Sequence, residues 1–131
     1  MSASQIVLIE DELDIADVLI FLLKIEGYEV TYAANGALAM KYLAGLTPDL
    51  IVTDIMMPVM DGAKLLESLR QIDRLRLIPT LVISALPEEA ASHMCKGFDA
   101  FLQKPFGADQ LLGAVQLLLD SRRALDPDVR T

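Results

Sequence analysis

Hydrophobic and polar positions follow two different periods along the 131-residue chain. Short runs rich in β-branched residues predict strands, and runs with apolar residues every three or four positions predict amphipathic helices. Residues 124–131 carry neither period and are expected to form a flexible C-terminal tail behind a single domain, 1–123. The predicted strands are 5–9, 28–33, 50–53, 79–85 and 98–103, and the predicted helices are 12–27, 35–46, 62–72, 87–97 and 107–123.

The regular alternation of strands and helices predicts an α/β fold, with a parallel sheet covered by helices on both faces. Because crossovers between parallel strands are right-handed, the sheet is expected to be doubly wound. In such sheets ligands bind beyond the carboxyl ends of the strands, where the winding reverses. The residues that follow each predicted strand are therefore the first candidates for a functional site.

Four of the five predicted strands end on polar groups that could act together. One polar strand end alone has an ordinary explanation, since acidic residues before a helix also stabilise the helix through its dipole. Their occurrence at successive strand ends is the stronger signal. The groups are Glu10-Asp11-Glu12 after the first strand, Asp54 after the third, Ser84-Ala85 after the fourth and Lys104-Pro105 after the fifth.

Composition narrows the class of protein. The chain is 53% hydrophobic, which is enough for a core and argues against disorder. Its formal net charge of −8 argues against binding to nucleic acid or anionic membranes. No apolar run approaches the ~18–20 residues that span a bilayer, and residues 1–12 lack the basic region and cleavage site of a signal peptide, so none is expected. With Cys95 as its one cysteine, the chain is expected to be cytoplasmic and free of intrachain disulfides.

Taken together, Glu10-Asp11, the segment DIMMPVMDG at 54–62, Ser84-Ala85 and Lys104-Pro105 resemble the receiver domain of bacterial two-component response regulators. The resemblance covers about 5–120. It implies a CheY-like sheet of strand order 2-1-3-4-5 with five helices. It also implies phosphorelay signalling: a sensor histidine kinase or a histidine phosphotransfer protein phosphorylates Asp54, and this switches an output surface for an unidentified downstream protein. A phosphorylation-dependent dimer is compatible with the same resemblance.

The resemblance assigns Asp54 as the phosphoacceptor, and a carboxylate nucleophile suits covalent phosphoryl transfer. Attack on an anionic phosphoryl group among acids needs a cation, and oxygen ligands suit Mg²⁺ or Mn²⁺. Asp11 and Asp54 are expected to bind the metal directly, and the resemblance implies the backbone carbonyl of Met56 as a further ligand. Glu10 is longer than the Asp that many relatives carry there, so its ligation, through water or direct, stays open.

Lys104 is expected to stabilise the transferred phosphoryl group, and Ser84 to hydrogen-bond to it once attached. The resemblance implies Phe101, three residues before the lysine, as the switch residue, and burial of its ring is expected to drive the switch. Met56 and Leu86 stand two residues after Asp54 and Ser84 and are apolar. Since neither can orient an attacking water, slow self-dephosphorylation is expected.

The first predicted helix has two apolar sides. Its core side is expected to carry Ile15, Leu19 and Leu22. Docking against a helix pair of the phosphodonor is expected on the other side, with ordinary surface exposure as the alternative. The residues of that docking side are Leu13, Ile20 and Phe21. Between Ser84 and Lys104 the chain is about two residues shorter than is usual in the family, which predicts that the fourth helix or the loop before it is trimmed.

Three other functions remain to be weighed. A phosphohydrolase of the haloacid dehalogenase type resembles D-x-D at its nucleophile, but Met56 occupies the second acidic position. A flavodoxin-like electron carrier needs a phosphate-binding loop after the first strand, where this chain has acids. A degenerate receiver would serve only as an interaction module, which the intact acids, Ser84 and Lys104 argue against. The chain is therefore not expected to be an enzyme beyond its own phosphorylation and dephosphorylation.

Overall fold

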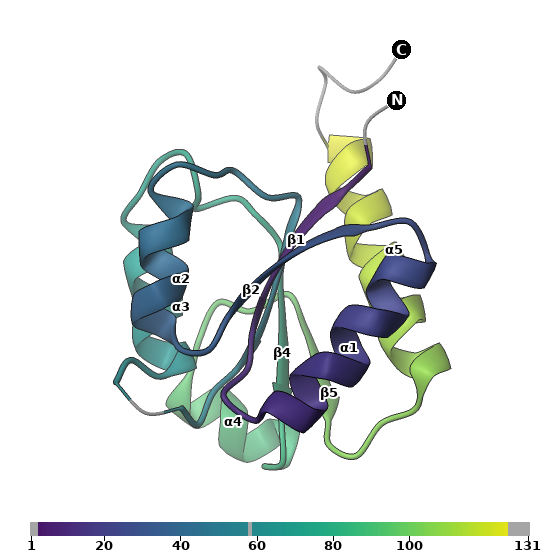
Figure 1. The fold of residues 1–131 in the computed structure, drawn as a ribbon. Coiled ribbons are helices and arrows are strands. Elements are labelled where there is room, and N and C mark those ends of the chain that lie inside the picture. The colour runs from purple at the N-terminus through teal and green to yellow at the C-terminus, as the bar shows by residue number, and fades with distance from the viewer. Residues whose placement is uncertain (1–2, 58, 126–131) are drawn as a thin grey trace.

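The computed structural model describes residues 3–57 and 59–125, with side chains described as far as Ser121. Five strands alternate with five helices, as predicted (Figure 1). The strands are β1 Gln5–Ile9, β2 Glu29–Ala33, β3 Leu50–Asp54, β4 Thr80–Ser84 and β5 Ala100–Gln103. The helices are α1 Leu13–Ile25, α2 Gly36–Leu43, α3 Gly62–Arg70, α4 Glu88–Met94 and α5 Ala108–Leu125. Helix α5 continues to Leu125, so the first two residues of the predicted tail, 124 and 125, are helical, and residues 126–131 lie outside the described residues.

The five strands form one parallel sheet of order β2-β1-β3-β4-β5, which confirms the predicted doubly wound topology. The helices α1 and α5 cover one face, and α2, α3 and α4 cover the other (Figure 1). In the register, Ile9 pairs with Thr53 and Asp54 pairs with Ile83. The carboxyl ends of β1, β3 and β4 therefore meet at one edge of the sheet.

The core consists of two clusters, one on each face of the sheet. All five residues of β3 and of β4 are buried, as expected for central parallel strands covered on both faces. The edge strand β5 is only half-buried, and its last residue is exposed. Asp54 and Ser84 are thus polar residues at the ends of buried strands whose other residues are mostly apolar.

Local hydrogen bonds explain where the helices begin and end. Helix α1 ends in a Schellman motif: Gly27, at φ +91°, donates its N–H to Lys24, and Tyr28 donates to Leu23. At the starts of α2 and α3, the side chains of Asn35 and Asp61 accept the N–H of the residue three positions on.

The core side of α1 differs from the prediction. Its buried residues are Ala16, Leu19 and Leu23, whereas Ile15 and Leu22 are only partly buried. The helix is therefore rotated by part of a turn relative to the predicted face. Because α1 is apolar on nearly every side, its sequence periodicity could not fix the rotation.

Helix α4 is shorter than predicted. The Lys-Gly pair at 96–97 predicts an end near Gly97, but the helix ends at Met94 and Cys95 is extended. The Cys95 side chain is buried in the same core cluster as Ala91 and Phe98. Burial raises the pKa of its thiol to about 11, as suits a structural residue. The helix has seven residues, and trimming of this helix or of the loop before it relative to the family stays a prediction.

None of the helices in the described part of the chain is long and apolar enough to cross a membrane.

Gly62 fixes the loop between β3 and α3. Its N–H donates to the carbonyl of Ile55 at 2.9 Å. A Cβ at this position would lie 2.4 Å from the carbonyl oxygen of Asp54 and 2.9 Å from the Cα of Ile55. The first turn of α3 therefore packs directly on the backbone at the end of β3.

Replacing Gly62 with Ala should lower the free energy of unfolding by about 1–3 kcal/mol, because backbone atoms must shift to admit the methyl group. Gly113 is the matched control, since a Cβ there meets no atom within 4 Å in the exposed middle of α5. Gly113→Ala should stabilise the protein by about 0.5–1 kcal/mol. Urea unfolding measures both. Equal stability of Gly62→Ala and the wild type would contradict the close packing.

Candidate functional site

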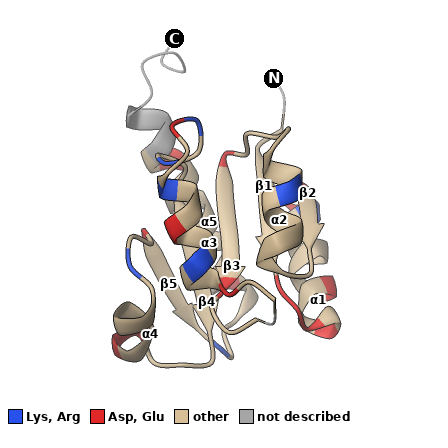
Figure 2. Ribbon diagram, turned by 90° about the vertical axis from the view of Figure 1, so that its left-hand side faces the viewer, with Lys and Arg blue, Asp and Glu red and all other residues tan. Residues whose placement is uncertain are grey.

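The polar strand ends predicted from the sequence gather at one edge of the sheet. Glu10 directly follows β1, Asp54 is the last residue of β3, Ser84 is the last residue of β4, and Lys104 directly follows β5. Acidic residues at the junction of β1 and α1 mark this edge (Figure 2). Because β3 lies between β1 and β4, Asp54 occupies the middle of the group.

Lys104 joins the first and third strand ends. Its ammonium nitrogen Nζ donates to Glu10 Oε1 at 2.6 Å and to Asp54 Oδ2 at 2.8 Å. The side chain of Glu10 is fully buried, and those of Asp54 and Lys104 are 7% and 13% exposed. The peptide bond between Lys104 and Pro105 is cis. Two buried carboxylates thus share one ammonium group.

The Asp54 carboxylate is held on both oxygens. Oδ1 accepts the backbone N–H of Ile55 at 2.6 Å and that of Met56 at 3.3 Å, and Oδ2 faces Lys104. The hydroxyl of Thr53 donates to the carbonyl of Asp54. These bonds hold the carboxylate in one orientation at the end of β3, close to a fixed positive charge.

Burial and charge shift the pKa values of this group. Desolvation raises the pKa of Glu10, and the hydrogen bonds from Lys104 and Glu12 offset only part of that rise. Desolvation acts to lower the pKa of Lys104, but the hydrogen bonds and charges of Asp54 and Glu10 together outweigh it and raise the pKa. Lys104 therefore stays an ammonium ion between the two acids.

Carboxylates suited to a metal ion lie beside this ammonium group. Ligand oxygens of Glu10, Asp11 and Glu12 lie within 4.8 Å of one another. Hard oxygen ligands of this kind fit Mg²⁺ or Mn²⁺, so the donor set agrees with the expected metal. Among the described residues Asp54 is not in this cluster, and Glu12, which the sequence analysis did not assign, is. The N–H of Glu12 donates to Glu10 Oε2.

The expected phosphate-binding and switch residues lie on the next two strands. Ser84 is buried, and its Oγ accepts the N–H of Leu86 at 3.1 Å, which leaves the hydroxyl hydrogen available to another acceptor. Phe101 is half-buried and packs against the core beside Phe98, with ring centroids 6.0 Å apart. Ser84 thus lies at the end of β4 and Phe101 on the neighbouring β5, and their roles in phosphate binding and switching stay predictions.

Tyr32 also belongs to the surroundings of the site, although the sequence analysis did not single it out. Its hydroxyl donates to the carbonyl of Glu10 at 2.6 Å. Burial raises the pKa of Tyr32, and the charges of Glu10, Asp11 and Asp17 raise it further. The sequence feature that could have identified Tyr32 is its position near the end of β2, the strand that pairs with β1.

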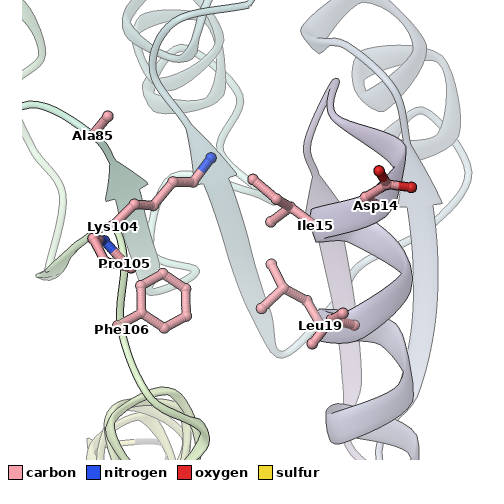
Figure 3. A pocket seen from close by; sticks show the side chains of 8 residues that line it. Asp14, Ile15, Leu19, Ala85, Lys104, Pro105 and Phe106 are labelled. Carbon is pink, nitrogen blue, oxygen red and sulfur yellow. The ribbon is translucent and has the colours of Figure 1, made fainter.

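An open, apolar pocket of about 530 Å³ adjoins Lys104 on the side of α1. Lys104 and Phe106 extend from the segment after β5 toward Ile15 and Leu19 of α1 (Figure 3). Two of the expected docking residues on α1 are exposed, Leu13 at 64% and Phe21 at 63%. The third, Ile20, is partly buried against the core, so its predicted outward position is wrong.

Comparisons with known proteins agree with this geometry. The family model of the response regulator receiver domain matches residues 6–116. The DNA-binding dual master transcriptional regulator RpaA of Synechocystis is 33% identical over 117 residues, which cover 88% of this chain and 48% of that protein.

Two solved structures are similar over most of their length. The signal receiver domain of a signal transduction histidine kinase from Syntrophus aciditrophicus is 33% identical, with a TM-score of 0.84, covering 91% of this chain and 92% of that one. The receiver domain of a sensor histidine kinase from Pseudomonas aeruginosa, with a magnesium ion coordinated in its active site cleft, is 26% identical. Its TM-score is 0.83, covering 91% and 99% of the two chains.

A second curated relative, the transcriptional regulatory protein PrrA of Mycobacterium leprae, is 33% identical over 126 residues, which cover 95% of this chain and 53% of that protein. This chain thus spans about half the length of RpaA and PrrA. The comparisons and the strand order confirm the family predicted from the strand ends. Receiver domains of this family are signalling switches that interact with histidine kinases and downstream effectors. The chain belongs to the response regulator receiver domain family, which carries phosphorelay signals in two-component systems.

Proposed function

We propose that Asp54 accepts a phosphoryl group and that the protein works as a phosphorylation switch. The observation that carries this proposal is the buried Asp54 carboxylate held 2.8 Å from the Lys104 ammonium group. Asp54 Oδ2 attacks phosphorus, an oxygen–phosphorus bond forms, and the bond to the donor's leaving group breaks with its electron pair. Lys104 then faces the oxygens that carry the developing negative charge.

The metal proposed for this step is Mg²⁺ or Mn²⁺, which would neutralise charge between the acids and the phosphoryl group. Asp11, Asp54 and the carbonyl of Met56 are the proposed direct ligands, and Glu10 the ligand through water. The carboxylate cluster around Asp11 and the magnesium ion in the Pseudomonas relative support this choice. The thioether of Met56 is a soft ligand that does not suit Mg²⁺, so its backbone carbonyl is the proposed ligand.

The switch follows from the residues that the phosphoryl group would recruit. Ser84 Oγ is the proposed donor to a phosphoryl oxygen, in exchange for its present contact with Leu86. Movement of Ser84 frees space behind it, and the half-buried ring of Phe101 moves further inward. Phosphate thus shifts the population between two packings of the face around β4 and β5, because only one packing gains the phosphate contacts.

The proposed partners are a sensor histidine kinase or a histidine phosphotransfer protein on the donor side and a downstream protein on the output side. The proposed donor surface is the side of α1 with the exposed Leu13 and Phe21. Ile20 is not part of this surface, because it packs against the core. The donor surface lies beside the apolar pocket next to Lys104. We place this exchange in the cytoplasm and in the domain of residues 1–123.

Incubation with acetyl phosphate and Mg²⁺ should add one phosphoryl group to the wild type, measured by intact mass. Asp54→Asn should gain none, because its amide is not a nucleophile. Asp61→Asn is the matched control in the same loop and should still be labelled, since Asn can also cap α3. Chelation with EDTA should abolish labelling. A phosphoryl group on Asp54→Asn would refute the assignment.

The phosphoryl group should persist for minutes rather than seconds, since Met56 and Leu86 cannot orient an attacking water. Replacing Met56 with Asn should shorten the lifetime several-fold by supplying a group that can hold such a water. The same change at Met94, an exposed methionine on α4, serves as the control and should leave the lifetime unchanged. Decay of the intact-mass signal after removal of the donor measures it. A wild-type lifetime of seconds would contradict this interpretation.

Leu13→Glu should slow phosphotransfer from a histidine kinase that labels the wild type by about tenfold or more, because it places a charge on the proposed donor surface. Labelling by acetyl phosphate should not change, since that small donor needs no such surface. Leu77→Glu, a matched change at a 78% exposed leucine between α3 and β4, should leave both rates unchanged. Equal kinase transfer to Leu13→Glu and the wild type would exclude Leu13 from the donor surface.

A further inference from the structure

Helix α1 carries a second apolar face directly opposite its core face. Val18, Phe21 and Ile25 are 58%, 63% and 63% exposed. At 100° per residue they lie within about 60° of one another and point away from the side that carries the buried Leu19 and Leu23. Their spacing of three and four residues is that of a helix–helix seam.

Such a face normally has a partner. A surface helix of a globular protein is polar on its outer side, and contiguous exposed apolar residues mark an interaction site. No part of the described chain buries Val18, Phe21 or Ile25. A second helix laid along α1 would bury all three.

We propose that this face binds α1 of a second copy of the same chain, in an antiparallel, two-fold symmetric pair. Asp17 and Lys24 are exposed and lie on the same flank of the apolar face, seven residues apart. In an antiparallel, two-fold symmetric pair, a flank of one helix lies against the same flank of the other helix, which runs in the opposite direction. Asp17 of each chain therefore faces Lys24 of the other, and the contact contains two equivalent ion pairs around Phe21.

The opposite orientation is unfavourable. The start of α1 is acidic, with Asp14 in its first turn and Asp11 and Glu12 just before it. In a parallel pair the acidic starts of the two helices would lie side by side and repel each other. Lys24 would then have no acidic residue of the other helix at the same level to pair with. Charge thus selects the antiparallel form from the two that the apolar face allows.

This contact goes beyond the proposed phosphorylation and does not depend on it, since no residue of the pair touches Asp54 in the hydrogen bonds described. It does affect access to the site. Val18 also lines the pocket beside Lys104, so the pair covers part of the surface proposed for the phosphodonor. Because a single helix pair is a small interface, the dimer is weak and depends on concentration.

Sedimentation velocity of the unphosphorylated full chain, from micromolar to millimolar concentration, tests the proposal. The weight-average mass of the wild type should rise from 14.3 kDa toward twice that value. Phe21→Glu should remain monomeric throughout. Leu117→Glu changes a 67% exposed leucine on α5 and should associate as the wild type does. A wild type that stays monomeric, or an equal rise for Phe21→Glu, overturns the proposal.

Charge reversal tests the antiparallel arrangement itself. Asp17→Lys and Lys24→Asp should each raise the dissociation constant about fivefold or more, because two attractive pairs become repulsive. The double variant Asp17→Lys/Lys24→Asp should return to within about twofold of the wild type, and an equimolar mixture of the single variants should also associate. Circular dichroism confirms that each variant is folded. Failure of both the double variant and the mixture to recover association overturns this pairing.

Discussion

The ammonium group of Lys104 is the interaction on which the site depends. Glu10 and Asp54 end neighbouring strands, and both are buried. Two carboxylates so placed would repel each other without a cation between them, and the loss of one partner from a buried ion pair is strongly destabilising. The cation comes from the far edge of the sheet, because β5 follows β4 in the strand order. The polar centre therefore requires β5 to be held in place, although that strand is only half-buried.

Arg70 contributes to holding the segment that leads into β5. Its guanidinium donates to the carbonyl of Arg76 at 2.7 Å and to the carbonyl of Gly97, and it lies 3.9 Å from a carboxylate oxygen of Asp99. Asp99 in turn accepts the N–H of Thr80 at the start of β4. The end of α3 is thereby joined to the loop after the short helix α4. Helix α4 contributes little burial of its own, since Ala91 is its one buried residue among those described. The contacts of Arg70 and Asp99 add polar links to the few apolar ones in this segment.

Most of the fold and of the site could be predicted because the signals are local. Alternating periods give the strands and helices, and polar residues at strand ends converge once the strands are parallel. The Schellman end of α1 at Gly27 and the cap by Asp61 depend on neighbouring residues alone. What could not be predicted depends on distant partners. The rotation of α1 depends on α5 and the sheet, and the end of α4 depends on burial of Cys95. The place of Tyr32 depends on the carbonyl of Glu10, just after β1.

The same interaction links the resting site to the proposed switch. Lys104 now satisfies Glu10 and Asp54 together, and a phosphoryl group on Asp54 would offer it further anionic oxygens. Glu10 is fully buried, and a buried anion that loses its cation is costly. A divalent cation bound by Asp11 and Asp54 and linked to Glu10 through water, as proposed, would compensate that loss, because carboxylate oxygens suit such an ion. The metal ion and Lys104 are therefore expected to act together, because neither cation alone can neutralise all of the carboxylates and the phosphoryl group.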